Sequence, residues 1–190
     1  MTNHPIVDSH HHFWEIERFD YSWMPPGSPL ATDYGPEDLK PLLKSPSVTH
    51  TVIVQAVSSP DEARWLLELA DEHDFIAGVV GWVDLTDPKV GNTLDELQQS
   101  AYFKGVRHIW EGEKDPAWIV NSGAINGLKE LSRRNLTFDF LAKPVNLPFI
   151  PVVMDLVPNL KAVVDHIAKP MIADAIIEPW LSDMRKVASI

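Results

Sequence analysis

The chain has 190 residues, of which 45% are hydrophobic and 23% are charged, the composition of an ordinary globular protein. Its net charge of −11 argues against a nucleic-acid partner, because such partners select basic surfaces. The chain has no cysteine, which excludes disulfides, zinc–thiolate sites and a thiol nucleophile and suits a reducing compartment.

The N-terminus has no charged region followed by a long apolar stretch, so we expect no signal peptide. No apolar run approaches the roughly 18 residues of a membrane span, so we expect no membrane partner and a cytoplasmic location.

Apolar segments typical of strands alternate with segments of helical periodicity along the chain. The expected strands are 6–10, 49–57, 76–83, 103–109, 136–141 and 160–166. The expected helices are 36–43, one that begins at Ser59, 92–100, 124–133, 149–157 and 179–188. For the second of these helices, Ser59 is expected to cap the start and Glu62 to complete a capping box.

Six strand–helix units in sequence predict an α/β fold with a parallel sheet. Either a doubly wound sheet or a barrel would satisfy this pattern. No Gly-x-Gly-x-x-Gly follows any strand, and polar residues gather at the carboxyl ends of the strands, where barrel enzymes keep their chemistry. These observations favour the barrel, of the (β/α)₈ TIM-barrel type with about six of its units present, but leave the doubly wound sheet open. We expect one domain over residues 1–190.

The clearest candidate site lies at the end of the first expected strand. Side chains alternate across a strand, so His10 and His12 share one face with Asp8 while His11 points the other way. Two imidazoles on one face can converge on a metal ion or on a substrate oxygen, with Asp8 orienting one of them. A His-x-His pair at a strand end can also be a simple polar edge.

Other polar residues fall at the ends of later strands. His166, after Asp165, would be a third imidazole that polarises a carbonyl or completes a metal site, or it is satisfied by backbone. Arg107 could hold a carboxylate or sugar hydroxyl, or form a salt bridge within the rim. The weaker candidates for substrate binding are His108, Lys143 and, as an aromatic wall, Trp14.

The chain resembles the amidohydrolase-2 family, in its sugar-lactone hydrolase branch of L-fuconolactonase-like and L-rhamnonolactonase-like proteins. The matching stretches are Ile6–Trp14, Gly78–Asp84, Lys104–His108 and Asp165–Pro170. The resemblance implies a (β/α)₈ barrel and a small-molecule lactone substrate, opened to the hydroxy acid by attack of water on the ring carbonyl. It implies that His10, His12 and His166 bind the metal or polarise the carbonyl, and that Arg107 helps to bind substrate.

The resemblance leaves metal use open, because relatives use either one divalent ion, with zinc favoured, or no metal. It also leaves open a dicarboxylate lactonase or a decarboxylase of the same superfamily.

The family continues to an eighth strand that ends in a Gly-Ser-Asp-Trp-Pro-like stretch, whose aspartate is the expected general base. No such stretch is found before Ile190, so we expect a C-terminally incomplete domain. Loss of a positioned base costs about 10²–10⁴-fold in rate. A non-catalytic truncated isoform or fragment is therefore a further alternative, and the oligomeric state stays open.

Overall fold

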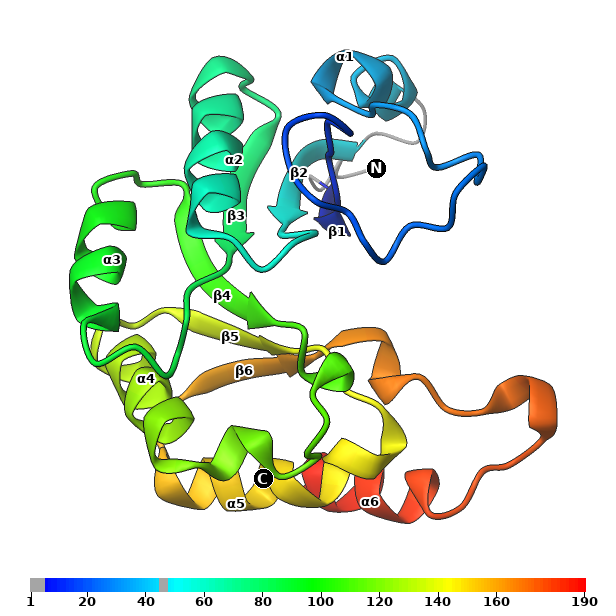
Figure 1. Ribbon diagram of the computed structural model, residues 1–190, viewed down its shortest axis with the longest axis vertical. Coiled ribbons are helices and arrows are strands. Elements are labelled where there is room, and N and C mark those ends of the chain that lie inside the picture. The colour runs from blue at the N-terminus through cyan, green and yellow to red at the C-terminus, as the bar shows by residue number, and fades with distance from the viewer. Residues whose placement is uncertain (1–5, 45–47) are drawn as a thin grey trace, which may run out of the picture. The chain divides into compact units, whose positions relative to one another are not determined.

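The structure is a computed structural model that describes residues 6–44 and 48–190 (Figure 1). Strands and helices alternate along these residues, as expected. The strands are β1 (Ile6–His11), β2 (Val48–Val54), β3 (Ile76–Gly81), β4 (Phe103–His108), β5 (Thr137–Phe140) and β6 (Lys161–Val164). The α-helices are α1 (Pro36–Leu39), α2 (Pro60–Glu72), α3 (Val90–Leu97), α4 (Ser122–Arg133), α5 (Ile150–Leu156) and α6 (Trp180–Val187).

The strands form one sheet in the order β1 to β6, and the ladders β1–β2, β2–β3, β4–β5 and β5–β6 are parallel. A doubly wound sheet reverses its strand order at a switch point, whereas a barrel adds each strand next to the previous one. The unbroken order therefore selects the barrel type between the two closures that the sequence left open.

The packing of the chain divides it into two compact units. One holds the described residues up to Trp82 together with Glu96–Lys104, and the other holds Val83–Asp95 and Gly105–Ile190. The expectation of a single domain over 1–190 stays a prediction.

In the first unit α2 packs against β3, and the buried side chains of Ile53, Leu66 and Val79 form part of the core. The side chain of Ser59 caps α2 by accepting the Asp61 N–H, as expected. The Glu62 carboxylate contacts the loop that precedes Ser59, further from the helix than the capping box expected from the sequence. Its buried carboxylate accepts hydrogen bonds from the backbone N–H groups that follow β2, at 2.9–3.2 Å, and so ties that loop to the helix.

In the second unit, large apolar side chains fill the space between β4–β5 and the helices. Trp110, Phe138 and Leu128 are among the fully buried ones. Gly105 of β4 faces Thr137 of β5 so closely that an added Cβ would lie 2.1 Å from the threonine hydroxyl. This contact lets β4 and β5 pair in register up to Arg107–Asp139 and His108–Phe140, which fixes the polar residues at their carboxyl ends.

Several sequence-based boundaries need correction. The strand expected over 49–57 is β2, which ends at Val54, and the helix expected over 92–100 is α3, which covers Val90–Leu97. The helix expected over 36–43 stops at Leu39, and a separate 3₁₀ turn covers Leu42–Lys44. The sixth strand, expected to reach His166, ends at Val164 and is followed by a 3₁₀ turn over Asp165–Ala168. His166 therefore projects from a turn and not from a strand.

Among the described residues, the helices are all too short or too polar to cross a membrane.

Candidate active site

His10 and His12 lie at the carboxyl end of β1 with their rings in contact. The ring centroids are 5.0 Å apart and the ring planes stand at 85°. The backbone N–H of His10 donates to Asp8 Oδ1 at 3.1 Å, so the carboxylate holds the end of the strand instead of the imidazole ring that the sequence suggested. The contact between the two rings agrees with the expectation that these histidines share a face.

The Nδ1 of His12 lies 2.7 Å from the backbone carbonyl oxygen of Val54 in β2. A carbonyl only accepts hydrogen bonds, so Nδ1 carries a proton, and in the neutral ring Nε2 carries the lone pair. A hydrogen bond from the second ring nitrogen to a backbone carbonyl is the usual support of a metal-binding histidine. His12 thus has the tautomer that a metal ligand or a hydrogen-bond acceptor needs.

His11 has a different role from its neighbours. Its Nε2 pairs with the hydroxyl of Thr51 in β2 at 2.8 Å, and its ring meets Phe13 edge-on. Burial lowers the pKa of His11 to about 4, against the attraction of Asp8. His11 is therefore neutral at physiological pH and links β1 to β2.

Trp14 lines an apolar cavity of about 260 Å³ together with His12, Phe13 and Tyr34. Its indole N–H donates to the carbonyls of Leu30 and Thr32 at 3.1 and 2.8 Å, and its ring packs edge-on against Tyr34. The long loop after β1 therefore fixes this aromatic wall beside His12. The role of Trp14 in substrate binding stays a prediction.

In the second unit Arg107 forms a buried ion pair. Its guanidinium lies 3.2 Å from Asp165 Oδ2, and both side chains are about 5% exposed or less. Asp139 stands beside Arg107 in the β4–β5 ladder and is also buried. The positive charge of Arg107 therefore acts on two buried carboxyl groups, those of Asp165 and Asp139. Burial, and next the negative charge of Asp165, raise the pKa of Asp139 from 3.8 to about 7, while Arg107 opposes the rise.

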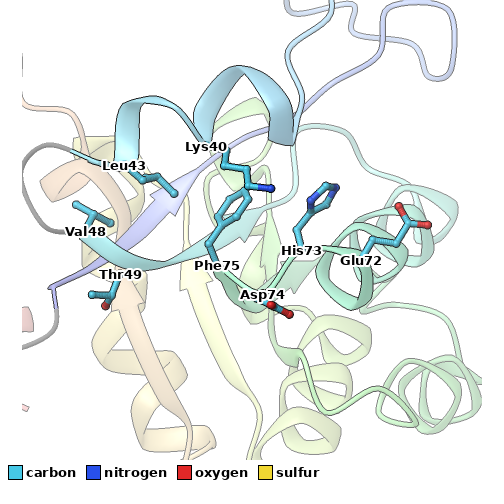
Figure 2. Close-up of a pocket in the computed structure, with 8 residues that line it drawn as sticks. All are labelled: Lys40, Leu43, Val48, Thr49, Glu72, His73, Asp74 and Phe75. Carbon is cyan, nitrogen blue, oxygen red and sulfur yellow. The ribbon is translucent and has the colours of Figure 1, made fainter.

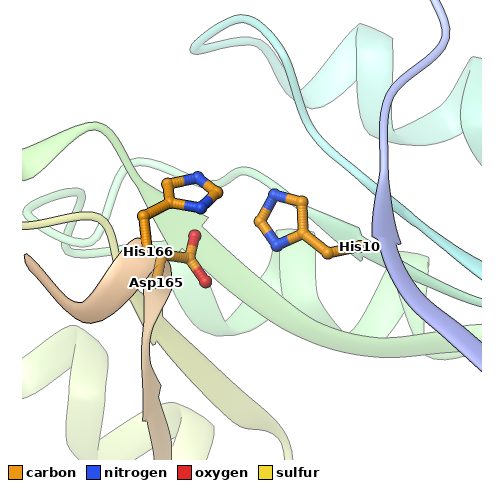
Figure 3. Close-up of side chains that lie close together, drawn as sticks. All are labelled: His10, Asp165 and His166. Carbon is orange, nitrogen blue, oxygen red and sulfur yellow. The ribbon is translucent and has the colours of Figure 1, made fainter. Parts of the chain in front are cut away.

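His166 follows Asp165 in the turn after β6, and its side chain is exposed (Figure 3). Its backbone has φ 51° and ψ 29°, in the left-handed region that non-glycine residues rarely occupy. Such conformations are concentrated at functional sites.

The other two candidates, His108 and Lys143, differ in their surroundings. His108 is the next residue of β4 and so projects to the opposite face. Its Nε2 pairs with Glu113 at 2.9 Å and its ring stacks on Trp118 at 4.1 Å, while burial lowers its pKa. The Lys143 side chain is exposed at the start of the 3₁₀ segment Pro144–Phe149. The substrate-binding roles of both residues stay predictions.

Asp139 is the residue that sequence reasoning missed. It is the single charged residue in Leu136–Ala142, an otherwise apolar and largely buried stretch. A lone acid inside a buried strand is costly without a partner, which is a usable signal.

A larger cavity of about 470 Å³ lies at the amino ends of β2 and β3 (Figure 2), whereas the paired histidines lie at the carboxyl end of β1. It is lined by Lys40, Leu43, Val48, Thr49, Glu72, His73, Asp74 and Phe75. Barrel enzymes keep catalysis at the carboxyl ends of the strands, so we expect His73 to take no part in the chemistry.

Comparison with known proteins gives a family for the chain. Residues 7–189 match the Amidohydrolase family. The chain is 34% identical over 184 residues to an L-fucono-1,5-lactonase from Burkholderia ambifaria, covering 96% of this chain and 63% of that protein. It is 31% identical to an L-fucono-1,5-lactonase from Burkholderia multivorans, of which it covers 64%. The chain thus spans less than two thirds of the length of these relatives.

Solved structures are consistent with this family. A crystal structure of an amidohydrolase from Burkholderia multivorans with bound zinc aligns with 98% of this chain and 66% of its own, at 32% identity and a TM-score of 0.91. A probable 2-pyrone-4,6-dicarboxylic acid hydrolase from Acinetobacter baumannii covers 96% of this chain and 66% of its own, at 18% identity and a TM-score of 0.72, and supports the fold alone. The predicted α/β fold of barrel type is confirmed, and the chain belongs to the amidohydrolase family.

Proposed function

We propose that the residues at the carboxyl ends of β1, β4 and β6 belong to a site that opens a sugar-acid lactone similar to L-fucono-1,5-lactone. The observation that carries the proposal is the 34% identity to an L-fucono-1,5-lactonase over 96% of this chain. The paired imidazoles of His10 and His12 support it, because a carbonyl under attack needs nearby polarising groups. The Nδ1–H of His12 bonds to backbone, which suits its Nε2 to bind a metal ion that would polarise the carbonyl.

In the reaction, the oxygen of a water molecule forms a bond to the ring carbonyl carbon, and the bond from that carbon to the ring oxygen breaks. The water gives up a proton and the ring oxygen gains one, so the product is an open hydroxy acid. We assign His10, His12 and His166 to the carbonyl and Arg107 to the substrate. A guanidinium has five N–H donors, so Arg107 can hold Asp165 and still offer donors to a substrate hydroxyl.

The side chains also fit a divalent metal ion such as zinc. We propose His10, His12 and His166 as its ligands. Asp165, the neighbour of His166 in the second unit, could add a carboxylate oxygen. Imidazole and carboxylate are the donors that zinc takes in hydrolases, and the Nδ1–H of His12 is anchored as in such sites. A bound ion would act as a Lewis acid toward the carbonyl.

The test measures acid release from L-fucono-1,5-lactone and binding of its product L-fuconate by the 190-residue chain, with zinc and with a chelator. A dicarboxylate lactone is included, because the resemblance left that substrate class open. His10→Ala and His166→Ala are the test variants. His73→Ala is the matched control, since His73 lies in the cavity at the amino ends of the strands (Figure 2).

Turnover or saturable product binding that disappears in His10→Ala and His166→Ala, and persists in His73→Ala, would support the proposal. The proposal fails if the folded chain neither turns over nor binds these compounds, or if all three variants behave alike. A small-molecule partner and a cytoplasmic location are part of the same proposal.

A further inference from the structure

The turn that bears His166 has an unusual backbone. Four consecutive non-glycine residues, His166 to Lys169, have positive φ angles of 51°, 49°, 55° and 47°. For L-amino acids this conformation brings Cβ too close to the following carbonyl oxygen, and a β-branched residue such as Ile167 tolerates it least. A run of this kind persists only where the surrounding structure holds it in place.

Burial of the turn itself explains little of its stability. Ala168 is fully buried, but the side chain of Ile167 is 52% exposed and that of His166 is exposed. The remaining support must come from directional contacts made by other segments.

Arg107 of β4 holds Asp165 at the start of the turn through their buried ion pair. Two further contacts reach the left-handed residues from other segments. The indole N–H of Trp180, the first residue of α6, donates to the backbone carbonyl of Ile167 at 2.7 Å. The ammonium of Lys169 pairs with Glu111, which follows β4, at 2.7 Å. One contact holds the middle of the turn and the other holds its end.

We propose that Trp180 and the Lys169–Glu111 pair are positioning residues that hold the left-handed turn and thereby set the direction of the His166 side chain. The carbonyl that Trp180 binds belongs to the residue next to His166, so this hydrogen bond restrains the backbone that carries the imidazole. The effect on catalysis rests on the proposed function, whereas the effect on the geometry of His166 does not.

The first test is Trp180→Phe, which keeps an aromatic ring and removes the N–H donor. Trp110→Phe is the matched control, because the Trp110 indole also donates to a backbone carbonyl, that of Pro116, at 3.0 Å. The readout is the imidazole NMR signals of the full chain, with His166 assigned through His166→Gln. We expect the His166 signal to shift or broaden in Trp180→Phe and to stay in place in Trp110→Phe.

The second test is Ile167→Gly, which examines the strain directly. Glycine adopts positive φ without a Cβ penalty, and the exposed Ile167 side chain contributes little packing. Its thermal midpoint should therefore equal or exceed that of the parent chain, whereas glycine in a relaxed position lowers the midpoint. A clear decrease would contradict the proposal, as would a His166 signal unaffected by Trp180→Phe.

The third test applies where the chain turns over lactone. Trp180→Phe and Lys169→Met should then lower kcat about three- to ten-fold, the effect of one lost hydrogen bond, with KM changed less than about two-fold. Lys169→Arg, which keeps the charge, should restore most of kcat. Absence of turnover in the parent chain would count against the proposed function alone. Unchanged kcat in Trp180→Phe, in an active chain, would overturn the positioning role.

Discussion

Replacement of Asp139 by asparagine should stabilise the protein, and more so at higher pH. The pKa of Asp139 is raised from 3.8 to about 7 by burial and by Asp165. The carboxyl group ionises near pH 3.8 in the unfolded chain and near pH 7 in the folded one. Its contribution to folding stability is therefore fully present below pH 3.8 and is lost as the pH rises through about 7. The two pKa values differ by about 3 pH units, each worth about 1.4 kcal/mol, so the ionised side chain costs up to about 4 kcal/mol at pH 8.

The assay is urea unfolding of the parent chain and of Asp139→Asn, followed by circular dichroism at pH 5 and pH 8. The linkage relation predicts that the variant is more stable by about 2 kcal/mol at pH 5 and about 4 kcal/mol at pH 8. Asp155→Asn, at an exposed position of α5, is the control and should change stability by less than about 0.5 kcal/mol. A difference between Asp139→Asn and the parent that is the same at both pH values would refute the reasoning.

Three further substitutions test the scaffold by urea unfolding. Gly105→Ala should lower the free energy of unfolding by about 1–3 kcal/mol, because its Cβ would overlap Thr137, whereas Gly112→Ala, which meets only ordinary contacts, should cost less than about 1 kcal/mol. Glu62→Gln should cost about 1.5–3 kcal/mol, since the amide loses the charge-assisted hydrogen bonds from the loop after β2. Burial lowers the pKa of His108, so the parent should lose stability relative to His108→Gln as the pH falls below 6.5. A difference in the free energy of unfolding between the parent and His108→Gln that is the same at pH 7.5 and pH 5 would contradict this.

Much of the fold could be predicted from the sequence because strands and helices here follow their periodicities. The apolar run that forms β3 is buried on both faces, and Ser59 marks the start of α2. The choice between a barrel and a doubly wound sheet is a matter of strand order, which local patterns do not encode. The family resemblance supplied that choice, and the order β1 to β6 agrees with it.

The candidate site was predictable where a short motif carries it. The spacing of His10 and His12 placed their rings together, as found. The turn around His166 was not predictable, because left-handed backbone is normally marked by glycine or asparagine and this segment has neither. Asp139 was missed because its signal is contextual: an acid in an apolar strand is informative only once a basic neighbour, Arg107, is known from the register of β4 and β5.

The buried acids near Arg107, Asp139 and Asp165, raise the question of whether Asp139 has a structural or a functional role. Burial, and next the negative charge of Asp165, raise the pKa of Asp139, and the positive charge of Arg107 only partly opposes that rise. A purely structural pair would need only Asp165. If Asp139→Asn is more stable yet weakens binding of L-fuconate, then Asp139 is kept at a cost in stability for the sake of the site, as expected of functional residues. If the variant is more stable and binding is unchanged, the acid has no part in the site and the pair of Arg107 with Asp165 is sufficient.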